Sequence, residues 1–280
     1  MSSHSRIRCL QATLDCALTF ALLSAPLGAQ GAPTPADPVP PHDTFTVDSR
    51  SLGEIRRINV YTPPAYDSSS KAQFPVLYMP DGGLDEDFPH VAHTVDSLIA
   101  LRVIRPVIVV GIPNTERRRD LTEPTRIKSD SAIAPRVGGS AAFRRFIRDE
   151  LMPAVRSRYR TTSERAIVGE SLAGLFIVET FLAEPTLFDH YVAFDPSLWW
   201  NGGALLDSAS ARLAASDRKS RTLYLASSKD DIDSRTAQLA GFLRAARPRG
   251  LAWVYEPSLD QTHATIFRVA GPGALALALR

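Results

Sequence analysis

RAIVGESLAGLF, residues 165–176, decides the fold of this 280-residue chain. A short apolar segment runs into GESLAG (169–174), and a second apolar segment follows. A serine on a sharp turn between a strand and a helix is typical of a nucleophile elbow, whose neighbouring residues are small because the backbone bends tightly. The strict pattern has glycine two residues after the serine, whereas this chain has Ala173 there and Gly174 next. Alanine is small enough for the bend, so the stretch predicts a strand, an exposed hydroxyl on Ser171 and a helix.

Apolar runs on both sides of this stretch predict the rest of the architecture. Short continuous runs are typical of strands buried on both faces of a parallel sheet, and they cover residues 74–79, 107–112, 166–168, 191–194, 222–226 and 251–255. Alternating segments predict antiparallel strands at the N-terminal edge of that sheet, over residues 45–49 and 57–62.

Helical patterns alternate with these strands. One begins near Ser140 and has an apolar face up to Val155, with a bend expected at Pro153. Another follows Ser171, and a third covers about residues 233–246. Alternating strands and helices predict an α/β protein with a mostly parallel sheet flanked by helices. The nucleophile elbow at Ser171 predicts that this sheet is of the α/β-hydrolase type. The length fits a single catalytic domain, which we place at residues 44–280.

The first residues have the layout of a secretory signal peptide. Arg6 and Arg8 precede an apolar stretch at 17–23, and small residues follow up to position 29. We expect residues 1–29 to be removed, which predicts a secreted or periplasmic protein with no membrane span after cleavage. The alternative is a membrane anchor, although the apolar stretch is shorter than the roughly 20 residues that a span needs. The segment 30–43, rich in Pro, Ala and Gly, predicts a flexible leader.

The cysteine content and the net charge limit the kinds of site that the protein can have. The chain contains only Cys9 and Cys16, and both lie in the predicted signal peptide. A mature protein without cysteine has neither a cysteine nucleophile nor a thiolate metal site. The net charge of +2 gives no support for nucleic-acid binding, which usually needs a strongly basic face.

A serine nucleophile needs a general base, and two histidines follow Ser171 in the sequence. His190 stands just before the predicted strand 191–194, which places it at the wrong end of the sheet. His263 lies after the last predicted strand, in the loop DQTHAT (260–265). Because the chain order in α/β-hydrolases is serine, acid, histidine, we expect His263 to be the base.

The acid of such a triad is expected after the strand 222–226. Asp230, Asp231 and Asp233 follow that strand in SSKDDID (227–233). Asp233 is placed to cap the next helix. We favour Asp230, which is nearest the end of the strand, with Asp231 as the other candidate. The alternative is a Ser–His dyad, in which the acidic group is a solvated loop.

An oxyanion hole requires backbone N–H groups directed at the developing negative charge. We expect one from Leu172, directly after the serine. The other is expected from Gly82 or Gly83, in the turn after the strand 74–79, where glycine lets the backbone approach a substrate closely. The alternative is an ordinary turn.

Several segments together resemble the esterase D-type esterases, a family that includes bacterial siderophore (enterobactin-type) esterases. The resemblance extends from about Phe45 to the C-terminal part, and the segments that carry it are FPVLYMPDG (74–82), GIPNTERRRDLT (111–122), GESLAGLF (169–176), FDPSLWW (194–200) and THATI (262–266). It implies an α/β-hydrolase fold without a metal or other cofactor, and it places Ser171 and His263 in the catalytic roles.

The resemblance also implies substrate contacts. In siderophore esterases an arginine of the segment equivalent to 111–122 helps to hold the acidic ligand, which points to Arg117 or Arg119; the alternative is a surface arginine in a salt bridge. Trp199 and Trp200 are candidates for lining an acyl or aryl pocket, or else are buried structural residues.

Three features depart from the family pattern. Glu170 stands where the family often has histidine, Glu123 separates Thr122 from Pro124, and GPG (271–273) is expected to break a long final helix. These departures bear on the prediction of a siderophore substrate more than on the prediction of ester hydrolysis. The sequence therefore predicts a serine carboxylic-ester hydrolase acting on a small-molecule ester. Alternatives are hydrolysis of a catecholate siderophore trilactone, removal of feruloyl or acetyl groups from polysaccharide, and a binding module that has lost catalysis.

Overall fold

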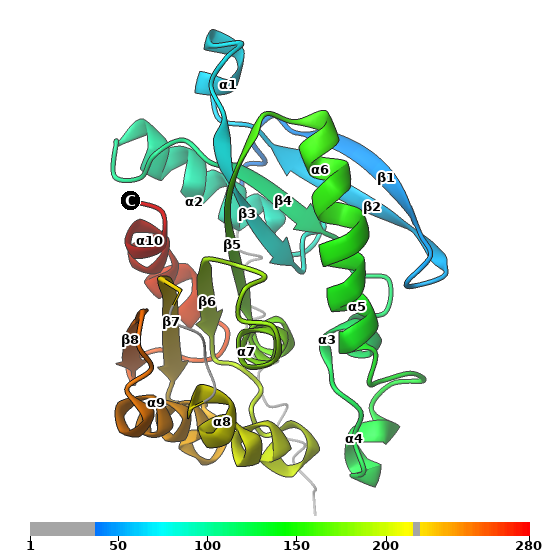
Figure 1. The fold of residues 1–280 in the computed structure, drawn as a ribbon, viewed down its shortest axis with the longest axis vertical. Helices are drawn as coiled ribbons and strands as arrows, with labels where there is room; N and C mark the ends of the chain where they lie inside the picture. Colours follow the sequence, from blue (N-terminus) through cyan, green and yellow to red (C-terminus); the bar gives the residue numbers. More distant parts are fainter. Residues whose placement is uncertain (1–36, 215–218) are drawn as a thin grey trace, which may run out of the picture. The chain divides into compact units, whose positions relative to one another are not determined.

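A computed structural model describes residues 37–214 and 219–280 of the protein. In this part of the chain the centre is an eight-stranded sheet in the order β1-β2-β4-β3-β5-β6-β7-β8 (Figure 1). The strands are β1 (Asp43–Ser49), β2 (Glu54–Tyr61), β3 (Phe74–Pro80), β4 (Ile108–Ile112), β5 (Thr161–Glu170), β6 (His190–Phe194), β7 (Arg221–Ser228) and β8 (Leu251–Ser258). β2 is antiparallel to both β1 and β4, and every other neighbouring pair is parallel. The predicted α/β class, with antiparallel strands at the N-terminal edge, is confirmed.

Helices cover both faces of this sheet (Figure 1). They are α1 (Ala65–Ser68), α2 (Phe88–Ala100), α3 (Arg117–Leu121), α4 (Lys128–Ala132), α5 (Ser140–Phe146), α6 (Met152–Arg158), α7 (Leu172–Ala183), α8 (Ala204–Ala214), α9 (Arg235–Ala246) and α10 (Ile266–Ala278). The helices α5 to α9 share one hydrophobic cluster with the sheet, while α2 and α10 share a second cluster with it.

The central strands explain why the sequence showed continuous apolar runs. Every residue of β3 and of β4 is buried. Tyr78 belongs to the cluster under α5 to α9, whereas its neighbours Leu77 and Met79 belong to the cluster under α2 and α10. Both alternating faces of the strand are therefore apolar, as expected for a parallel sheet between two helical layers.

The helical pattern that begins at Ser140 holds a local irregularity. A π-helical turn, Ile147–Leu151, connects α5 to α6. Pro153 is the second residue of α6, directly after this turn, and a proline has no N–H to donate to the carbonyl groups of the preceding turn. The irregularity therefore precedes the proline at which the sequence predicted a bend.

The prediction that GPG (271–273) breaks the final helix is wrong. α10 is continuous from Ile266 to Ala278 and contains Pro272. A proline inside a helix costs about 3 kcal/mol or more, because one hydrogen bond is lost. Burial of the face that holds Phe267 and Ala274 against α2, β6 and β7 opposes that cost.

The predicted signal peptide, residues 1–29, lies outside the described residues, and the predicted leader 30–43 is described from residue 37 onward. Asp37 forms an ion pair with Arg268 at 2.6 Å, and His42 packs edge-on against Phe88 at 5.6 Å between ring centres. The described end of the leader therefore contacts the folded body. Among the described helices, none has the length and apolar character needed to cross a bilayer.

Candidate active site

Ser171 lies on the predicted strand-to-helix turn, between the last residue of β5 and the first residue of α7. Its backbone has φ 60° and ψ −120°, a conformation that residues other than glycine rarely adopt. Its N–H donates to Phe194 O at 3.0 Å, and its carbonyl accepts from Ser197 N at 3.0 Å. The strained turn is thus held by main-chain bonds to the segment that follows β6.

Contacts around the elbow explain why Ala173 is tolerated. A Cβ atom added to Gly169 would lie 2.6 Å from the Cβ of Ala173. The missing side chain at position 169 therefore provides the space that the alanine methyl group occupies. A Cβ atom added to Gly174 would lie 3.0 Å from Phe194 O, so this glycine lets α7 approach the end of β6.

His263 lies in the loop between β8 and α10, and its ring contacts an acid that the sequence did not single out. Its Nδ1 atom is 3.0 Å from Oδ2 of Asp195, the residue directly after β6. Asp195 is only 4 % exposed, and it also accepts hydrogen bonds from the N–H (2.6 Å) and the hydroxyl (2.5 Å) of Ser228. Three donors therefore fix this carboxylate.

The two acids expected beside the histidine lie elsewhere. Oδ2 of Asp230 accepts a hydrogen bond from the main-chain N–H of His263 at 2.8 Å. Oδ2 of Asp231 accepts from the N–H of Thr236 at 3.1 Å, in the first turn of α9. Asp230 thus anchors the loop that carries the histidine and Asp231 caps a helix, so neither takes the expected place at the ring.

The contact between Asp195 and His263 shifts the pKa values of both groups, in opposite directions. Burial opposes ionisation of Asp195, but hydrogen bonds from His263 and Ser228 outweigh it and hold the pKa of the carboxyl below its ordinary value. The hydrogen bond to Asp195 raises the pKa of His263 above 6.5, against the effect of burial, and the charge of Glu170 raises it further.

A hollow of about 480 Å³ contains both the candidate nucleophile and the candidate base. Its lining includes Ser171, Ser197 and His263, and the hydroxyl oxygens of the two serines are 3.4 Å apart. Half-buried Trp199 and half-exposed Ile232 give the hollow its apolar side.

Two further predicted residues lie away from that hollow. Trp200 is 1 % exposed, and its indole N–H donates to Glu123 O at 2.8 Å; it is a structural residue. His190 is the first residue of β6, and its Nε2 atom lies 2.9 Å from Oε1 of Glu164. It therefore lies at the opposite end of β6 from Asp195.

The predicted oxyanion donors differ in availability. Leu172 is the first residue of α7, and the first N–H groups of a helix have no acceptor within it. The N–H of Gly82 donates to Ile112 O at 3.1 Å, so that donor is occupied within the fold. The N–H of Gly83 donates to Oε2 of Glu86 at 2.7 Å.

The two candidate arginines have different surroundings. Arg119 is 12 % exposed and donates to Glu54 (2.7 Å) and Asp120 (2.6 Å). Arg117 forms a two-bond pair with Asp81, at 2.7 and 2.8 Å, and is 37 % exposed. Arg119 therefore stabilises the fold, whereas Arg117 has an accessible face at the carboxyl end of the sheet.

Glu170, the residue before Ser171, is a further acidic group at this end of the sheet. Its Oε1 atom is buried and has no hydrogen-bond partner among the described residues. Burial raises the pKa of Glu170, and the opposing charge of His263 lowers it less. Burial and the charge of Asp81 also raise the pKa of Asp87, to about 6.

The described residues contain no group of three or more His, Cys, Asp or Glu side chains placed to hold a metal ion.

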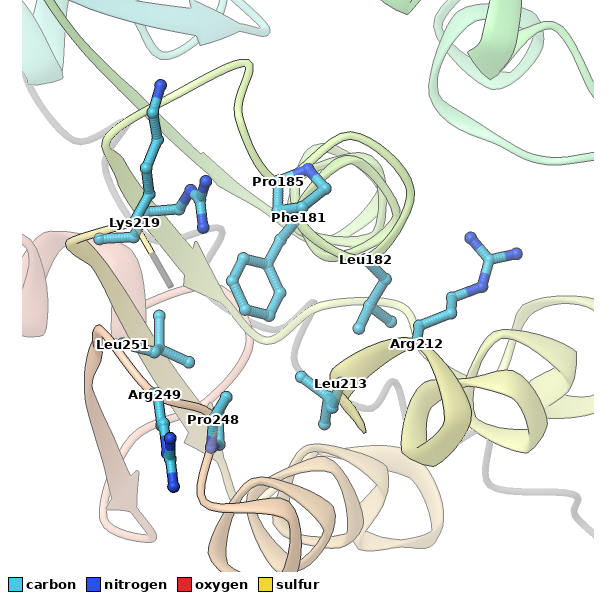
Figure 2. A pocket seen from close by; sticks show the side chains of 10 residues that line it. Phe181, Leu182, Pro185, Arg212, Leu213, Lys219, Pro248, Arg249 and Leu251 are labelled. Atoms are coloured by element: carbon cyan, nitrogen blue, oxygen red, sulfur yellow. The ribbon is translucent and has the colours of Figure 1, made fainter. Parts of the chain in front are cut away.

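Another hollow, shown in Figure 2, is bordered by the C-terminal part of α7 and by the first residues of β7 and β8. Phe181, Leu182 and Leu251 contribute to its lining, and it contains none of the candidate catalytic side chains.

Comparison with known proteins identifies the family of the chain. Residues 49–251 match the family model described as "Putative esterase". The chain belongs to this esterase family. It is 29% identical over 171 residues to ferri-bacillibactin esterase BesA of Bacillus subtilis (strain 168), a match that covers 54% of this chain and 57% of the relative.

Two further relatives extend the comparison. The chain is 31% identical over 194 residues to siderophore triacetylfusarinine C esterase of Aspergillus fumigatus, covering 64% of this chain and 63% of that one. The matched stretch thus covers less than two thirds of either curated relative. An IroE-like serine hydrolase from Shewanella oneidensis superposes with a TM-score of 0.77 at 27% identity, covering 85% of this chain and 79% of that chain.

Proposed function

We propose that the protein is a serine carboxylic-ester hydrolase with Ser171 as nucleophile, His263 as general base and Asp195 as the acid that orients the base. One observation carries the proposal: the buried Asp195 carboxylate lies 3.0 Å from Nδ1 of the histidine that shares a hollow with the elbow serine. Membership of an esterase family supports the same reaction class.

Each group has a role that follows from its charge. Asp195 stays ionised because its pKa is lowered, so Nδ1 of the ring carries the proton and Nε2 is free to accept one. Nε2 takes the hydroxyl proton of Ser171 as Oγ attacks the ester carbonyl. The resulting imidazolium then protonates the departing alcohol, and a water activated by the same nitrogen releases the acyl group.

We infer that the N–H of Leu172 binds the oxyanion of the tetrahedral intermediate, together with the N–H of Gly83. Gly83 now donates to Glu86, so its N–H has to exchange this carboxylate for the substrate oxygen. The occupied N–H of Gly82 is the weaker candidate.

The substrate class that we propose is the ester of a small molecule, with a siderophore ester as the foremost candidate. The names of both curated relatives support this choice. The apolar side formed by Trp199 and Ile232 suits an apolar or aromatic acyl group, and the accessible face of Arg117 suits an acidic ligand. Feruloyl and short acyl esters are the competing substrates.

Replacement of Ser171 with alanine tests the reaction. We expect the variant to lose hydrolysis of p-nitrophenyl acetate while it keeps the wild-type circular dichroism spectrum and melting temperature; unchanged turnover would refute the proposal. The wild-type enzyme is then compared on a siderophore trilactone, a feruloyl ester and short acyl esters. The highest kcat/KM on the trilactone supports the siderophore ester, and the highest value on a feruloyl ester contradicts it.

We also propose that the chain is exported and cleaved after Ala29. Expression with the native N-terminus, followed by mass measurement of the exported protein, tests this. A mature N-terminus at Gln30 agrees with it, and retention of residue 1 contradicts it.

A further inference from the structure

A second polar hollow, of about 520 Å³, lies beside the first half of β5. Arg148, Arg156 and Arg165 line it together with Tyr78 and Thr161. It is distinct from the candidate active site, because Ser171 follows the last residue of β5 and lines a different hollow.

Half-buried Arg165 has no acidic partner for its guanidinium group among the described residues. Its only side-chain contact with a possible acceptor in the described chain is from Nη1 to Sδ of Met152, at 3.7 Å. Its Nε atom is buried without any partner among the described residues. Asp189 accepts a hydrogen bond from the main-chain N–H of Arg165 at 2.9 Å, not from the guanidinium. Buried polar groups in proteins are nearly always paired, and an arginine is always charged.

Tyr78 lines the same hollow. The side chain is 2 % exposed, and its hydroxyl makes no hydrogen bond within residues 37–214 and 219–280. Burial raises the pKa of this hydroxyl, against the opposing charges of Arg165 and Arg156. It therefore remains a neutral O–H donor, and it lines the hollow that Arg165 lines.

The charges around the hollow are unbalanced. Arg148 is engaged by Asp149 at 2.9 Å and by Glu184 at 2.6 Å. In the described part of the chain, Arg156 and Arg165 have no ion pair with an acidic side chain. Exposed Arg156, half-buried Arg165 and the unpaired hydroxyl of Tyr78 therefore line one hollow whose lining contains no acidic side chain.

We propose that this hollow binds an oxyanion, either free phosphate or the phosphate group of a small molecule, with Arg165 and Arg156 as its cationic partners and Tyr78 as a hydroxyl donor. The planar guanidinium matches pairs of phosphate oxygens. A tetrahedral anion offers several acceptor oxygens to donors on β3, β5 and α6. Thr161, which also lines the hollow, offers one further hydroxyl. A planar carboxylate offers only two oxygens.

The test measures binding of inorganic phosphate to the full chain. Melting temperatures are recorded in increasing phosphate against sodium chloride at equal ionic strength, and calorimetric titration gives the dissociation constant. An anion that binds only the native state raises the melting temperature with its concentration. Phosphate is expected to stabilise the wild type beyond chloride, and acetate to do so less.

Variants identify the site. Arg165→Met keeps the length of the stem beside Met152 and removes an unpaired charge, so we expect no loss of melting temperature in chloride and a dissociation constant for phosphate at least about tenfold higher. Tyr78→Phe is expected to weaken binding while leaving the core filled. Arg145→Gln removes an exposed charge of α5 that does not line the hollow, and should bind phosphate as the wild type does.

Each result supports or overturns the site. Hydrolysis of p-nitrophenyl acetate by Arg165→Met and Tyr78→Phe verifies that they are folded. Tighter binding of glycerol 3-phosphate than of phosphate identifies a phosphorylated small molecule as the ligand class, and equal or weaker binding identifies the free anion. Phosphate that fails to stabilise the wild type beyond chloride, or that stabilises Arg165→Met and Tyr78→Phe as much as the wild type, overturns the proposal.

Discussion

Oδ2 of Asp195 lies 3.0 Å from Nδ1 of His263, although 68 positions separate the two residues. The acid comes from the end of β6, next to the strand that carries the elbow, and Ser228 at the end of β7 donates two hydrogen bonds to it. The end of β7 therefore holds the carboxylate that contacts His263 and does not supply that carboxylate.

Replacing Asp195 with asparagine should reduce kcat for p-nitrophenyl acetate by about 10³- to 10⁴-fold, because an amide no longer holds the imidazole in the tautomer that leaves Nε2 free. Steady-state kinetics at several pH values measure the loss.

Asp230→Asn is the matched control for this change. The asparagine oxygen is still able to accept the main-chain N–H of His263, so kcat should fall less than about tenfold, since only one hydrogen bond is weakened. A larger loss in Asp230→Asn than in Asp195→Asn would assign the acid to Asp230 after all.

Activity should depend on the charge of Glu170. The base must be neutral to accept a proton, so kcat/KM should fall as the pH drops through the pKa of His263, which lies above its ordinary 6.5. Glu170 raises this pKa, and Glu170→Gln should move the acid limb of the pH profile to lower pH. An unmoved limb, or one displaced to higher pH, would show that Glu170 does not act on the base.

Exchanging the small residues of the elbow should change the stability of the fold. Gly169→Ala places a methyl group against the Cβ of Ala173 and should destabilise the fold by about 1–3 kcal/mol, as overpacking typically does. Adding Ala173→Gly removes the clashing methyl and should restore part of the loss. Denaturant unfolding of both single variants and the double variant measures the coupling; additive losses would disprove the shared space.

Replacing Arg119 should change the stability of the fold, whereas replacing Arg117 should change substrate binding. Arg119→Gln leaves Glu54 and buried Asp120 with fewer partners, so it should lower the melting temperature and leave KM unchanged. Arg117→Gln should raise KM for an acidic ester more than for p-nitrophenyl acetate. Equal effects of Arg117→Gln on both substrates would remove Arg117 from ligand binding.

Local chemistry made much of this architecture predictable. Runs that are buried on both faces, such as β3, have to be apolar throughout, and a serine between a strand and a helix needs small neighbours. His263 could be chosen as the candidate base because it is the histidine that follows the last strand. These features depend on residues close together in the sequence.

The remaining features depend on contacts between distant segments. The sequence shows Asp195 after a strand, but not that the loop of His263 reaches this strand end instead of the end of β7. Arg117 and Arg119 are chemically alike, and only their partners distinguish them. Pro272 appeared to break a helix because the opposing contribution comes from the tertiary packing of α10.

Reaction with a fluorophosphonate, followed by intact-mass measurement and peptide mapping, tests the catalytic assignment most directly. The account predicts one adduct per chain, on Ser171, with no adduct in Ser171→Ala and much slower labelling in Asp195→Asn. An unlabelled wild-type protein, or an adduct on another residue, would contradict it.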